Sequence, residues 1–296
     1  MPAWKGKFIR NAIQSIMGQT STDWELIVVD DCSPDKLEKI VAEFNDPRIR
    51  YCRNETNLGG KDLVAQWNHS ITFATGDWIV LAGDDDMYDS RFAEEVIRLA
   101  AKYSDVNLIR SRVEQIGEKS EHLYDDGIAP EFETKEEFFE DYLEAKTFTC
   151  IGNYAFKRET LLEAGGFANL PCAFGSDIVT PLMLCTEGVA QTQEMLFKFR
   201  QSSIHLSSDS RKLWEKQEAV NSMFEWFSSV DWIAARFGER LHAKYLYDIF
   251  NLCVVNMPIK SVISAIKKCR LCTFCEKAVM AIRWAKRRVM LLGKSI

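Results

Sequence analysis

The sequence predicts an α/β protein with a mostly parallel central sheet, helices on both faces of that sheet, and a helical region at the C-terminal end. Two observations support this prediction. The first 110 residues alternate between helical periodicity and short apolar runs that end in acidic residues, which is the pattern of βαβ units. After about residue 211 the pattern is helical to the end of the chain.

The first third of the chain supplies these elements in regular order. The run KFIRNAIQSIMGQ places its apolar residues on one helical face, and ELIVVDD is typical of a buried parallel strand. The same periodicities predict helices at residues 35–44, 60–74 and 90–103, and strands in RIRYCR, DWIVLAGDDD and VNLIRSRVEQI. Farther along, residues 134–146 predict an acidic helix and QTQEMLFKFRQS a strand.

The start of the chain departs from this order, because a βαβ sheet should open with a strand and this sequence opens with a turn and a helix. We expect the first strand to be missing from this sequence, unless another segment fills its place. A central strand makes many buried contacts, so an inactive, truncated fragment is one alternative for this chain.

Composition narrows the functional classes. The chain has 296 residues, of which 47% are hydrophobic, so it can bury a substantial core. We expect two regions, with residues 1–210 forming the α/β domain and residues 211–296 the helical region. The formal net charge of −6 argues against general nucleic-acid binding. No run of about 18 apolar residues occurs, so a membrane span is not expected.

Two acidic clusters follow predicted strands. Asp30 and Asp31 close the strand in ELIVVDD, and Asp84, Asp85 and Asp86 close the strand in DWIVLAGDDD. Parallel strands would bring both clusters to the same edge of the sheet, where open α/β sheets bind ligands. Adjacent carboxylates repel one another, and Mg²⁺ or Mn²⁺ is a natural partner for them together with phosphate oxygens. The simpler interpretation is that the acids cap helices or face water.

With these clusters, the sequence resembles a family 2 glycosyltransferase of the GT-A fold, of the type that makes bacterial polysaccharides. The resemblance covers about residues 1–210. It rests on the opening MPAWKGKFIRNAIQSIMGQT, similar to the family's P-x-Y-N turn, and on WELIVVDDCSPD, NETNLGG, the DxD-type motif in TGDWIVLAGDDDMY, GGF with AFGSD, and FRQSSIHLSSDS. The resemblance also implies an apolar strand directly before the opening turn.

The resemblance implies a nucleotide-binding role for the opening turn. Pro2, Ala3 and Trp4 match the residues that contact the base, where Trp4 replaces the usual Tyr and can still stack on a uracil face. Lys5 stands where the family usually has Asn.

Two later positions match the nucleotide site as well. Asp31 matches the aspartate that accepts a hydrogen bond from the base edge, although it could instead cap a helix. Lys61, in the loop at residues 57–61, matches a position near the nucleotide and would meet a phosphate or remain solvated.

The resemblance also implies the chemistry of transfer. Asp84, Asp85 and Asp86 match the metal-binding region, and one of them, Asp84 among the candidates, would also contact the donor nucleotide. The order A-G-D-D-D differs from the usual D-x-D-D, which leaves the choice of ligand open. Asp177 matches the catalytic base, which takes the proton from the attacking hydroxyl, or else caps the helix that follows it. Arg200, Ser203 and His205 match a segment that lines the phosphate or acceptor site.

We therefore expect an inverting, metal-dependent glycosyltransferase. It would move a sugar from a nucleotide sugar, with UDP as the expected nucleotide, to a hydroxyl of a glycan or lipid-linked acceptor in surface polysaccharide synthesis. A nucleotidyltransferase is an alternative, but the Gly-rich basic loop typical of that class is not visible. A phosphoacceptor receiver module is another, and it predicts only about 120 residues with a lone later Asp.

The C-terminal segment differs in charge from the rest of the chain. Residues 258–296 contain ten Lys or Arg and one acidic residue, Glu276, interleaved with apolar residues at helical spacing. This pattern predicts peripheral contact with the anionic inner face of the cell membrane, or a packed helix with a solvated basic face. No signal peptide pattern opens the chain, so we expect a cytoplasmic location. Cys269, Cys272 and Cys275 are spaced like iron–sulfur ligands but also like residues of a helix.

Overall fold

The computed structural model describes residues 1–202, 212–256, 264, 266–273, 276–277 and 280. The chain divides into two compact units. The first comprises Met1–Asn169 and Ser176–His205, and the second comprises Leu170–Gly175 and Leu206–Ile296.

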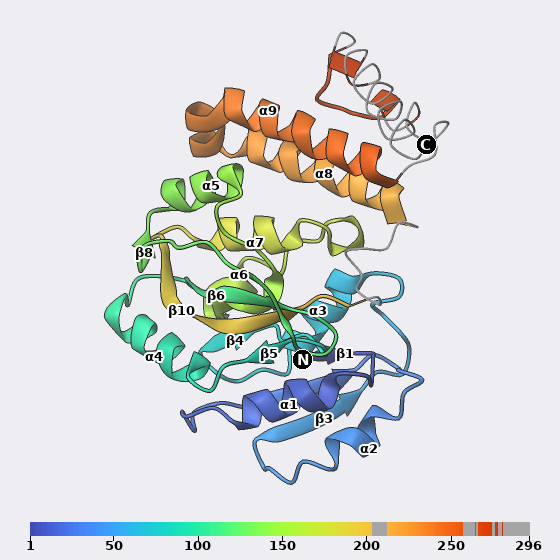
Figure 1. The fold of residues 1–296 in the computed structure, drawn as a ribbon, viewed down its shortest axis with the longest axis vertical. Helices are drawn as coiled ribbons and strands as arrows, with labels where there is room; N and C mark the ends of the chain where they lie inside the picture. The colour runs from blue at the N-terminus through green and yellow to red at the C-terminus, as the bar shows by residue number, and fades with distance from the viewer. Residues whose placement is uncertain (203–211, 257–263, 265, 274–275, 278–279, 281–296) are drawn as a thin grey trace. The chain divides into compact units, whose positions relative to one another are not determined.

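The first unit contains a three-stranded parallel sheet in the order β1-β2-β3 (Figure 1). Its strands are β1 (Pro2–Ala3), β2 (Leu26–Asp30) and β3 (Ile49–Arg53). All five residues of β2 are buried, as expected for a central parallel strand. Helices α1 (Ile9–Met17) and α2 (Leu37–Val41) connect the strands and confirm the alternation that the sequence predicts.

The position beside β2 is taken by β1, which has only two residues. Pro2 is in register with Val29, the Val29 amide donates to the Met1 carbonyl at 2.9 Å, and the Asp31 amide donates to the Ala3 carbonyl at 2.8 Å. The opening turn of the sequence therefore begins with a short strand, which brings the residues after it to the carboxyl end of β2.

A second, seven-stranded sheet is mixed. Its main path is β4-β9-β6-β10-β5, and β7 pairs with β6 while β8 pairs with β10. Only β6 and β10 pair in parallel among the strands that the structure describes in this sheet. The strands are β4 (Trp78–Val80), β5 (Met87–Tyr88), β6 (Leu108–Ile116), β7 (His122–Asp125), β8 (Phe132–Glu133), β9 (Tyr154–Lys157) and β10 (Val189–Arg200).

Parallel pairing is thus less extensive than the sequence pattern suggests. Some of the antiparallel strands follow tight turns instead of crossover helices. The β6–β7 hairpin is an example, because it closes with a bond from the Gly117 amide to the Glu121 carbonyl and a positive φ of 62° at Ser120. Such tight turns can join only antiparallel strands.

Five further helices belong to the first unit. They are α3 (Leu63–Ile71), α4 (Phe92–Lys102), α5 (Lys135–Glu144), α6 (Arg158–Glu163) and α7 (Ser176–Leu184). Asp62 caps α3 by accepting from the Ala65 amide, and Thr134 forms a capping box with Glu137 at the start of α5. A short 3₁₀ turn, η1 (Ile151–Asn153), precedes β9.

One hydrophobic core joins the two sheets of the first unit. It includes Ile9 and Ile13 from α1, Val28 from β2, and Val113 and Phe197 from the second sheet. These five side chains are fully buried. Burying a side chain of this size contributes about 2 kcal/mol, so the shared core fixes the edges of the sheets against each other.

The second unit is helical in its described part. Helices α8 (Leu213–Ser229) and α9 (Asp231–Asn256) pack against each other, and a 3₁₀ turn, η2 (Pro171–Ala173), packs against α8. Phe224 packs edge-on against Phe227 and Tyr245, and the Tyr245 hydroxyl donates to Asn221 Oδ1 at 2.7 Å. Cys269 is buried there and accepts from Gln217 Nε2 at 3.7 Å, whereas Cys275 lies outside the described residues.

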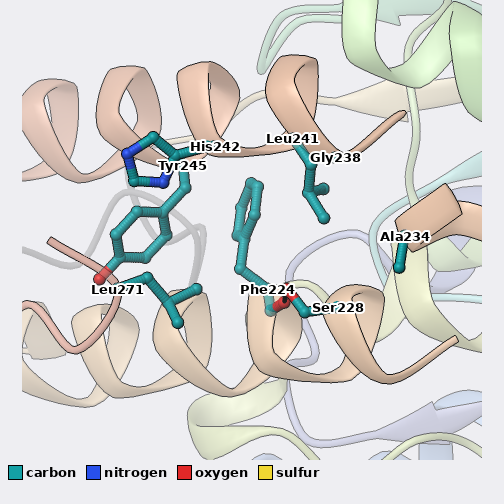
Figure 2. A pocket seen from close by; sticks show the side chains of 8 residues that line it. All are labelled: Phe224, Ser228, Ala234, Gly238, Leu241, His242, Tyr245 and Leu271. Carbon is teal, nitrogen blue, oxygen red and sulfur yellow. Dashed lines mark hydrogen bonds between the residues drawn. The ribbon is translucent and has the colours of Figure 1, made fainter. Parts of the chain in front are cut away.

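A pocket of about 250 Å³ opens within this helical unit (Figure 2). Its wall is mainly apolar, with His242 and Tyr245 along one side, and it is lined by Phe224, Ser228, Ala234, Gly238, Leu241, His242, Tyr245 and Leu271.

In the described part of the chain, no helix combines the length and the apolar character that crossing a bilayer requires.

Candidate active site

The turn after β1 and the loop after β4 are joined by one carboxylate. Asp84 Oδ2 accepts from the Trp4 amide at 2.8 Å and from the Lys5 amide at 2.7 Å. Burial raises the pKa of Asp84 to about 6, and repulsion from Asp85 adds to the shift. Asp84 is therefore both an acidic group of the cluster and the residue that holds the opening turn in place.

Asp85 and Asp86 complete the acidic loop. Asp86 is buried, and its Oδ1 accepts from the Arg200 amide at 3.0 Å. Burial and then repulsion from Asp85 raise the pKa of Asp86 well above its usual range. Burial also raises the pKa of Asp85, while the cations of Lys5 and Arg200 oppose that shift. The three carboxyl groups that the sequence predicts as metal ligands therefore lie in one loop, and burial raises the pKa of each of them.

Gly83 allows the loop to fold this tightly. A Cβ atom at this position would lie 2.8 Å from Asp86 Oδ2 and 3.1 Å from Asp85 Oδ1. Any side chain would therefore push the two carboxylates out of their present positions. The glycine belongs to the A-G-D-D-D motif, but only the structure shows which atoms it must avoid.

The side chain of Arg200, at the end of β10, supports the same loop from beneath. Its Nε donates to the Asp85 carbonyl at 2.8 Å, and its Nη1 donates to the Gly117 carbonyl and to Ser120 Oγ, both at 3.0 Å. The guanidinium also lies 4.6 Å from the Phe8 ring centroid, and the residue is only 1% exposed. Arg200 therefore positions the acidic loop and does not line an open surface. Its two sequence partners, Ser203 and His205, lie outside the described residues.

Asp31 organises the loop at residues 57–60. Its Oδ1 accepts from Asn54 Nδ2 and from the Leu58 amide, both at 2.8 Å, and its Oδ2 accepts from the Gly59 amide at 2.7 Å. Helix α2 begins at Leu37 with Lys36 as its N-cap, so Asp31 does not cap it. A carboxylate can accept about four hydrogen bonds, which leaves Oδ2 able to accept one more.

Asp30 has a different environment from its neighbour. Its carboxylate accepts from the Tyr51 hydroxyl at 2.5 Å, from the Ser33 amide at 2.7 Å and from Arg53 Nη1. Burial and the bond to Asp30 raise the pKa of Tyr51 to about 12. Asp30 is fully buried and ties β2 to β3, so it is a structural residue.

The side chains of the opening turn differ in accessibility. Trp4 is 45% exposed, and its carbonyl accepts from Ser33 Oγ at 2.5 Å, which fixes the backbone beneath the indole. Pro2 and Ala3 form β1, and Ala3 is buried. Lys61 is exposed at the end of the loop that Asp31 holds. The structure therefore offers the indole of Trp4 and the ammonium group of Lys61 to solvent.

Asp177 lies in the first turn of α7, which begins at Ser176. The helix-cap interpretation is therefore wrong, because Asp177 is inside the helix. Burial raises the pKa of its carboxyl to about 7. Burial also raises the pKa of the Cys150 thiol, and the charges of Asp86 and Asp177 both add to that shift. Helix α7 also packs against η1, whose Gly152 carbonyl accepts from the hydroxyl of Tyr88, two residues after Asp86.

The GGF segment before α7 depends on a contact that the sequence does not signal. Asn68 of α3 accepts from the Phe167 amide at 2.8 Å through Oδ1 and donates to the Phe167 carbonyl at 3.3 Å through Nδ2. Gly166 has a φ of 91°, and a Cβ there would lie 2.4 Å from Asn68 Oδ1. Asn68 carries no motif, since it is one polar residue of an amphipathic helix.

Comparison with known proteins identifies the family. The model of "Glycosyl transferase family 2" matches residues 1–165. Among curated relatives, WcaA of Escherichia coli strain K12, a glycosyl transferase named for colanic acid biosynthesis, is 39% identical over 89 residues, which is 29% of this chain and 31% of that protein. The UDP-Glc:alpha-D-GlcNAc-diphosphoundecaprenol beta-1,3-glucosyltransferase WfgD of Escherichia coli is 32% identical over 103 residues, 34% of this chain and 40% of that protein. The matches thus span less than half of these relatives.

Solved structures share the fold over most of the chain. TarS residues 1–349 of S. aureus, solved in complex with UDP-GlcNAc, superimpose with a TM-score of 0.67 at 16% identity, covering 96% of this chain and 87% of TarS 1–349. The mannosyltransferase PcManGT of Pyrobaculum calidifontis, in complex with GDP-Man and Mn²⁺, gives a TM-score of 0.55 at 17% identity, covering 96% of this chain and 78% of PcManGT. At these identities the likeness establishes the fold alone. Because the family model covers more than half of the chain, and the fold agrees with it, this protein belongs to glycosyl transferase family 2 and has the GT-A fold.

Proposed function

We propose that this protein is an inverting, metal-dependent glycosyltransferase that moves a sugar from a UDP-sugar to a hydroxyl of a glycan or lipid-linked acceptor in surface polysaccharide synthesis. The observation that carries the proposal is the joining of three segments by hydrogen bonds. Asp84 of the acidic loop holds the opening turn, and Arg200 at the end of β10 holds the acidic loop.

The names of the similar proteins support the choice of substrates. WfgD is named for transfer from UDP-Glc to a diphosphoundecaprenol-linked sugar, and TarS was solved with UDP-GlcNAc. PcManGT was solved with GDP-Man and Mn²⁺, so the fold alone does not choose the base. The exposed Trp4 favours base stacking, which any base allows.

The donor nucleotide would lie along the opening turn. We assign base stacking to Trp4, with Pro2 and Ala3 shaping the turn beneath it. The remaining acceptor position on Asp31 Oδ2 suits a base N–H, as uracil has at N3. Lys61, which is exposed at the end of the loop that Asp31 holds, would bind a phosphate of the donor. Asp84 would contact the donor while it holds the turn.

A divalent cation fits the acidic loop only together with the donor. Among the described residues, no three His, Cys, Asp or Glu side chains are arranged to hold a metal ion by themselves. Mg²⁺ and Mn²⁺ commonly take one or two carboxylates and complete their shell with phosphate oxygens and water. Asp85 is the best placed ligand, because two amides engage Asp84 Oδ2 and the Arg200 amide engages Asp86 Oδ1. A bound cation would offset the charge that develops on the leaving diphosphate.

Asp177 would act as the base. Inverting transfer needs a carboxylate that removes the proton from the acceptor hydroxyl as it attacks. A pKa of about 7 suits this task near neutral pH, because the ionised form is available and still basic enough to accept the proton.

We also propose a cytoplasmic enzyme that contacts the inner face of the cell membrane through its basic C-terminal segment. A lipid-linked acceptor would make such contact useful. Most of residues 258–296 lie outside the described residues, so the sequence pattern is what supports this part of the proposal.

Calorimetric titration of UDP tests the proposal, with and without Mn²⁺ and with GDP and CMP as controls. We expect Mn²⁺-dependent binding that is tighter for UDP than for either control. Asp85→Ala should remove the Mn²⁺ dependence, because it removes the carboxylate with the fewest structural bonds.

A well-folded protein that binds none of these nucleotides would refute the donor site. If the protein prefers GDP, the proposed transferase activity stands, but the base of the donor nucleotide is guanine and not uracil. Labelling of an aspartate by acetyl phosphate, with no nucleotide binding, would favour the receiver alternative.

A further inference from the structure

Asp31 is held by a side-chain amide that is itself held from behind. Asn54 follows β3, and its Nδ2 donates to Asp31 Oδ1 and to Gln66 Oε1, both at 2.8 Å. The nitrogen of a side-chain amide carries two hydrogens, so both of them are used. Gln66 belongs to α3 and is 2% exposed, and Asp31 is 3% exposed. The three side chains therefore form a chain of hydrogen bonds in a region with little water.

The two ends of this chain fix the direction of each amide. The Val29 carbonyl can only accept, and Gln66 Nε2 faces it at 3.4 Å. Gln66 Oε1 therefore points to Asn54, which presents its nitrogen to that oxygen. If the Asn54 amide turned over, its own oxygen would face the oxygens of Gln66 and Asp31, and no hydrogen would lie between them. Gln66 thus determines which atom of Asn54 meets Asp31.

The carboxylate of Asp31 is left with one acceptor position in a fixed direction. Asn54 and the Leu58 amide fill Oδ1, and the Gly59 amide donates to Oδ2. A Cβ atom at Gly59 would lie 3.0 Å from Asp31 Oδ2 and 3.5 Å from Gln66 Cβ, so the loop leaves little room around the carboxylate. Because three donors hold the carboxylate, the remaining position on Oδ2 can select a ligand atom that carries a hydrogen.

We propose that Gln66 is a positioning residue that selects the base of the donor nucleotide through Asn54 and Asp31. This inference rests on the proposed function. Uracil has an N–H at N3, which the open position on Asp31 Oδ2 can accept. Cytosine has a lone pair at N3, which a carboxylate repels. Gln66 acts without touching the nucleotide, because it keeps Asp31 in the orientation that distinguishes the two bases.

The preference for one base over another tests this assignment. Calorimetry with saturating Mn²⁺ compares UDP with CDP and with UDP methylated at N3, which has lost the N–H. The wild type should bind UDP about tenfold or more tightly than either analogue, because a hydrogen bond to a charged group is gained. Gln66→Met keeps the length of the side chain and removes its polar atoms. It should reduce the preference to about threefold or less by weakening UDP, while CDP affinity stays within about twofold.

A double-mutant cycle shows whether Gln66 acts through Asn54. Asn54→Ala should reduce the preference for UDP as Gln66→Met does. The double variant should show no further reduction, because the two residues belong to one chain of hydrogen bonds.

Gln19→Met is the matched control. The side chain of Gln19 also joins separate segments of the first unit, because it donates to the Asp89 carbonyl at 2.6 Å and accepts from the Ala93 amide at 2.8 Å. Its loss should lower the free energy of unfolding, measured with urea, and leave the ratio of UDP to CDP affinity within about twofold of the wild type.

The possible outcomes separate this inference from the proposed function. Equal losses of UDP and CDP affinity in Gln66→Met, an unchanged preference, or additive effects in the double variant would overturn the Gln66 assignment and leave the proposed function in place. If Gln66→Met does not fold, Asn54→Ala decides, and a wild-type preference in that variant overturns the inference. A wild type that binds UDP and CDP equally would overturn the base contact of Asp31 and this inference, but not the transferase activity. A wild type that binds no nucleotide would overturn the proposed donor site and this inference with it.

Discussion

At the scale of single residues, neighbouring aspartates have different roles in the site. Asp30 ends β2 and its carboxylate ties two strands together, whereas Asp31, one residue later, holds the loop at residues 57–60. Successive side chains of a strand point to opposite faces, so adjacent acids meet different partners. The sequence could locate both acids, because an apolar run ends there. It could not assign most of their partners, because Tyr51 lies 21 residues from Asp30 and Asn54 lies 23 residues from Asp31.

The first prediction concerns Asp177. Its pKa of about 7 means that kcat/KM should rise with pH and level off above about 7, since only the ionised carboxyl acts as a base. Asp177→Asn should lower kcat by about 100-fold or more, while UDP affinity stays within about twofold. Transfer rates measured from pH 5 to 9, with a UDP-sugar chosen by screening UDP-sugars for turnover, check this.

Stability supplies a control for the same variant. The folded protein keeps the Asp177 proton to a higher pH than the unfolded chain, so this group makes the fold less stable as pH rises from about 4 to about 7. Asp177→Asn should therefore raise the Tm at pH 8 relative to the wild type and change it little at pH 4. A variant that loses activity and is also less stable at pH 8 would mean that Asp177 is structural.

At the scale of elements, one strand end supports the acidic loop. The pattern QTQEMLFKFRQS predicts β10 correctly, and the motif around Arg200 is what suggests an open phosphate or acceptor site. The structure instead turns the guanidinium inward, where the carbonyls of Asp85 and Gly117 need donors. The motif predicts that Arg200 belongs to the site, but it does not predict where the guanidinium points. That orientation depends on the carbonyls of two other loops.

The second prediction concerns this support. Arg200→Met removes the buried donors and leaves several carbonyl oxygens without partners, so the free energy of unfolding should fall by about 3 kcal/mol. Mn²⁺ affinity should fall as well, because the loop that carries Asp85 and Asp86 loses its anchor. Urea unfolding and Mn²⁺ titration measure the two effects.

Arg98→Met is the matched control for that variant. Arg98 is exposed and pairs with Glu95 and Glu131 on the surface of the first unit. Its loss should lower the free energy of unfolding by less than about 1 kcal/mol. If Arg200→Met were as mild as Arg98→Met, the supporting role of Arg200 would be wrong.

At the scale of the whole molecule, the first half of the chain was more predictable than the middle. Segments such as 25–31 and 90–103 have clear periodicity, and β2 and α4 appear there. Short strands such as β5 and β8, with two residues each, carry no periodicity and form only because longer strands offer them partners. The mixed pairing of the second sheet therefore could not be predicted from local pattern.

The third prediction concerns the basic segment. Residues 281–296 contain five Lys or Arg and no acidic residue. Each basic residue near an anionic surface contributes about 1 kcal/mol, so deleting residues 281–296 should weaken binding to phosphatidylglycerol vesicles at least about tenfold. Vesicle co-sedimentation measures this, with phosphatidylcholine vesicles and UDP affinity as controls that should not change. If the full-length chain does not co-sediment with anionic vesicles, the proposed membrane contact is refuted.

The contacts of Asp84 have a consequence for folding. Its bonds to the Trp4 and Lys5 amides close sequence separations of 80 and 79 residues, and Arg200 reaches Asp85 across 115. Such non-local contacts form only after the chain has lost much of its loop entropy, so they are expected late in folding. The donor site would then be among the last parts of the first unit to assemble. Nucleotide affinity would report that both sheets have reached their native arrangement.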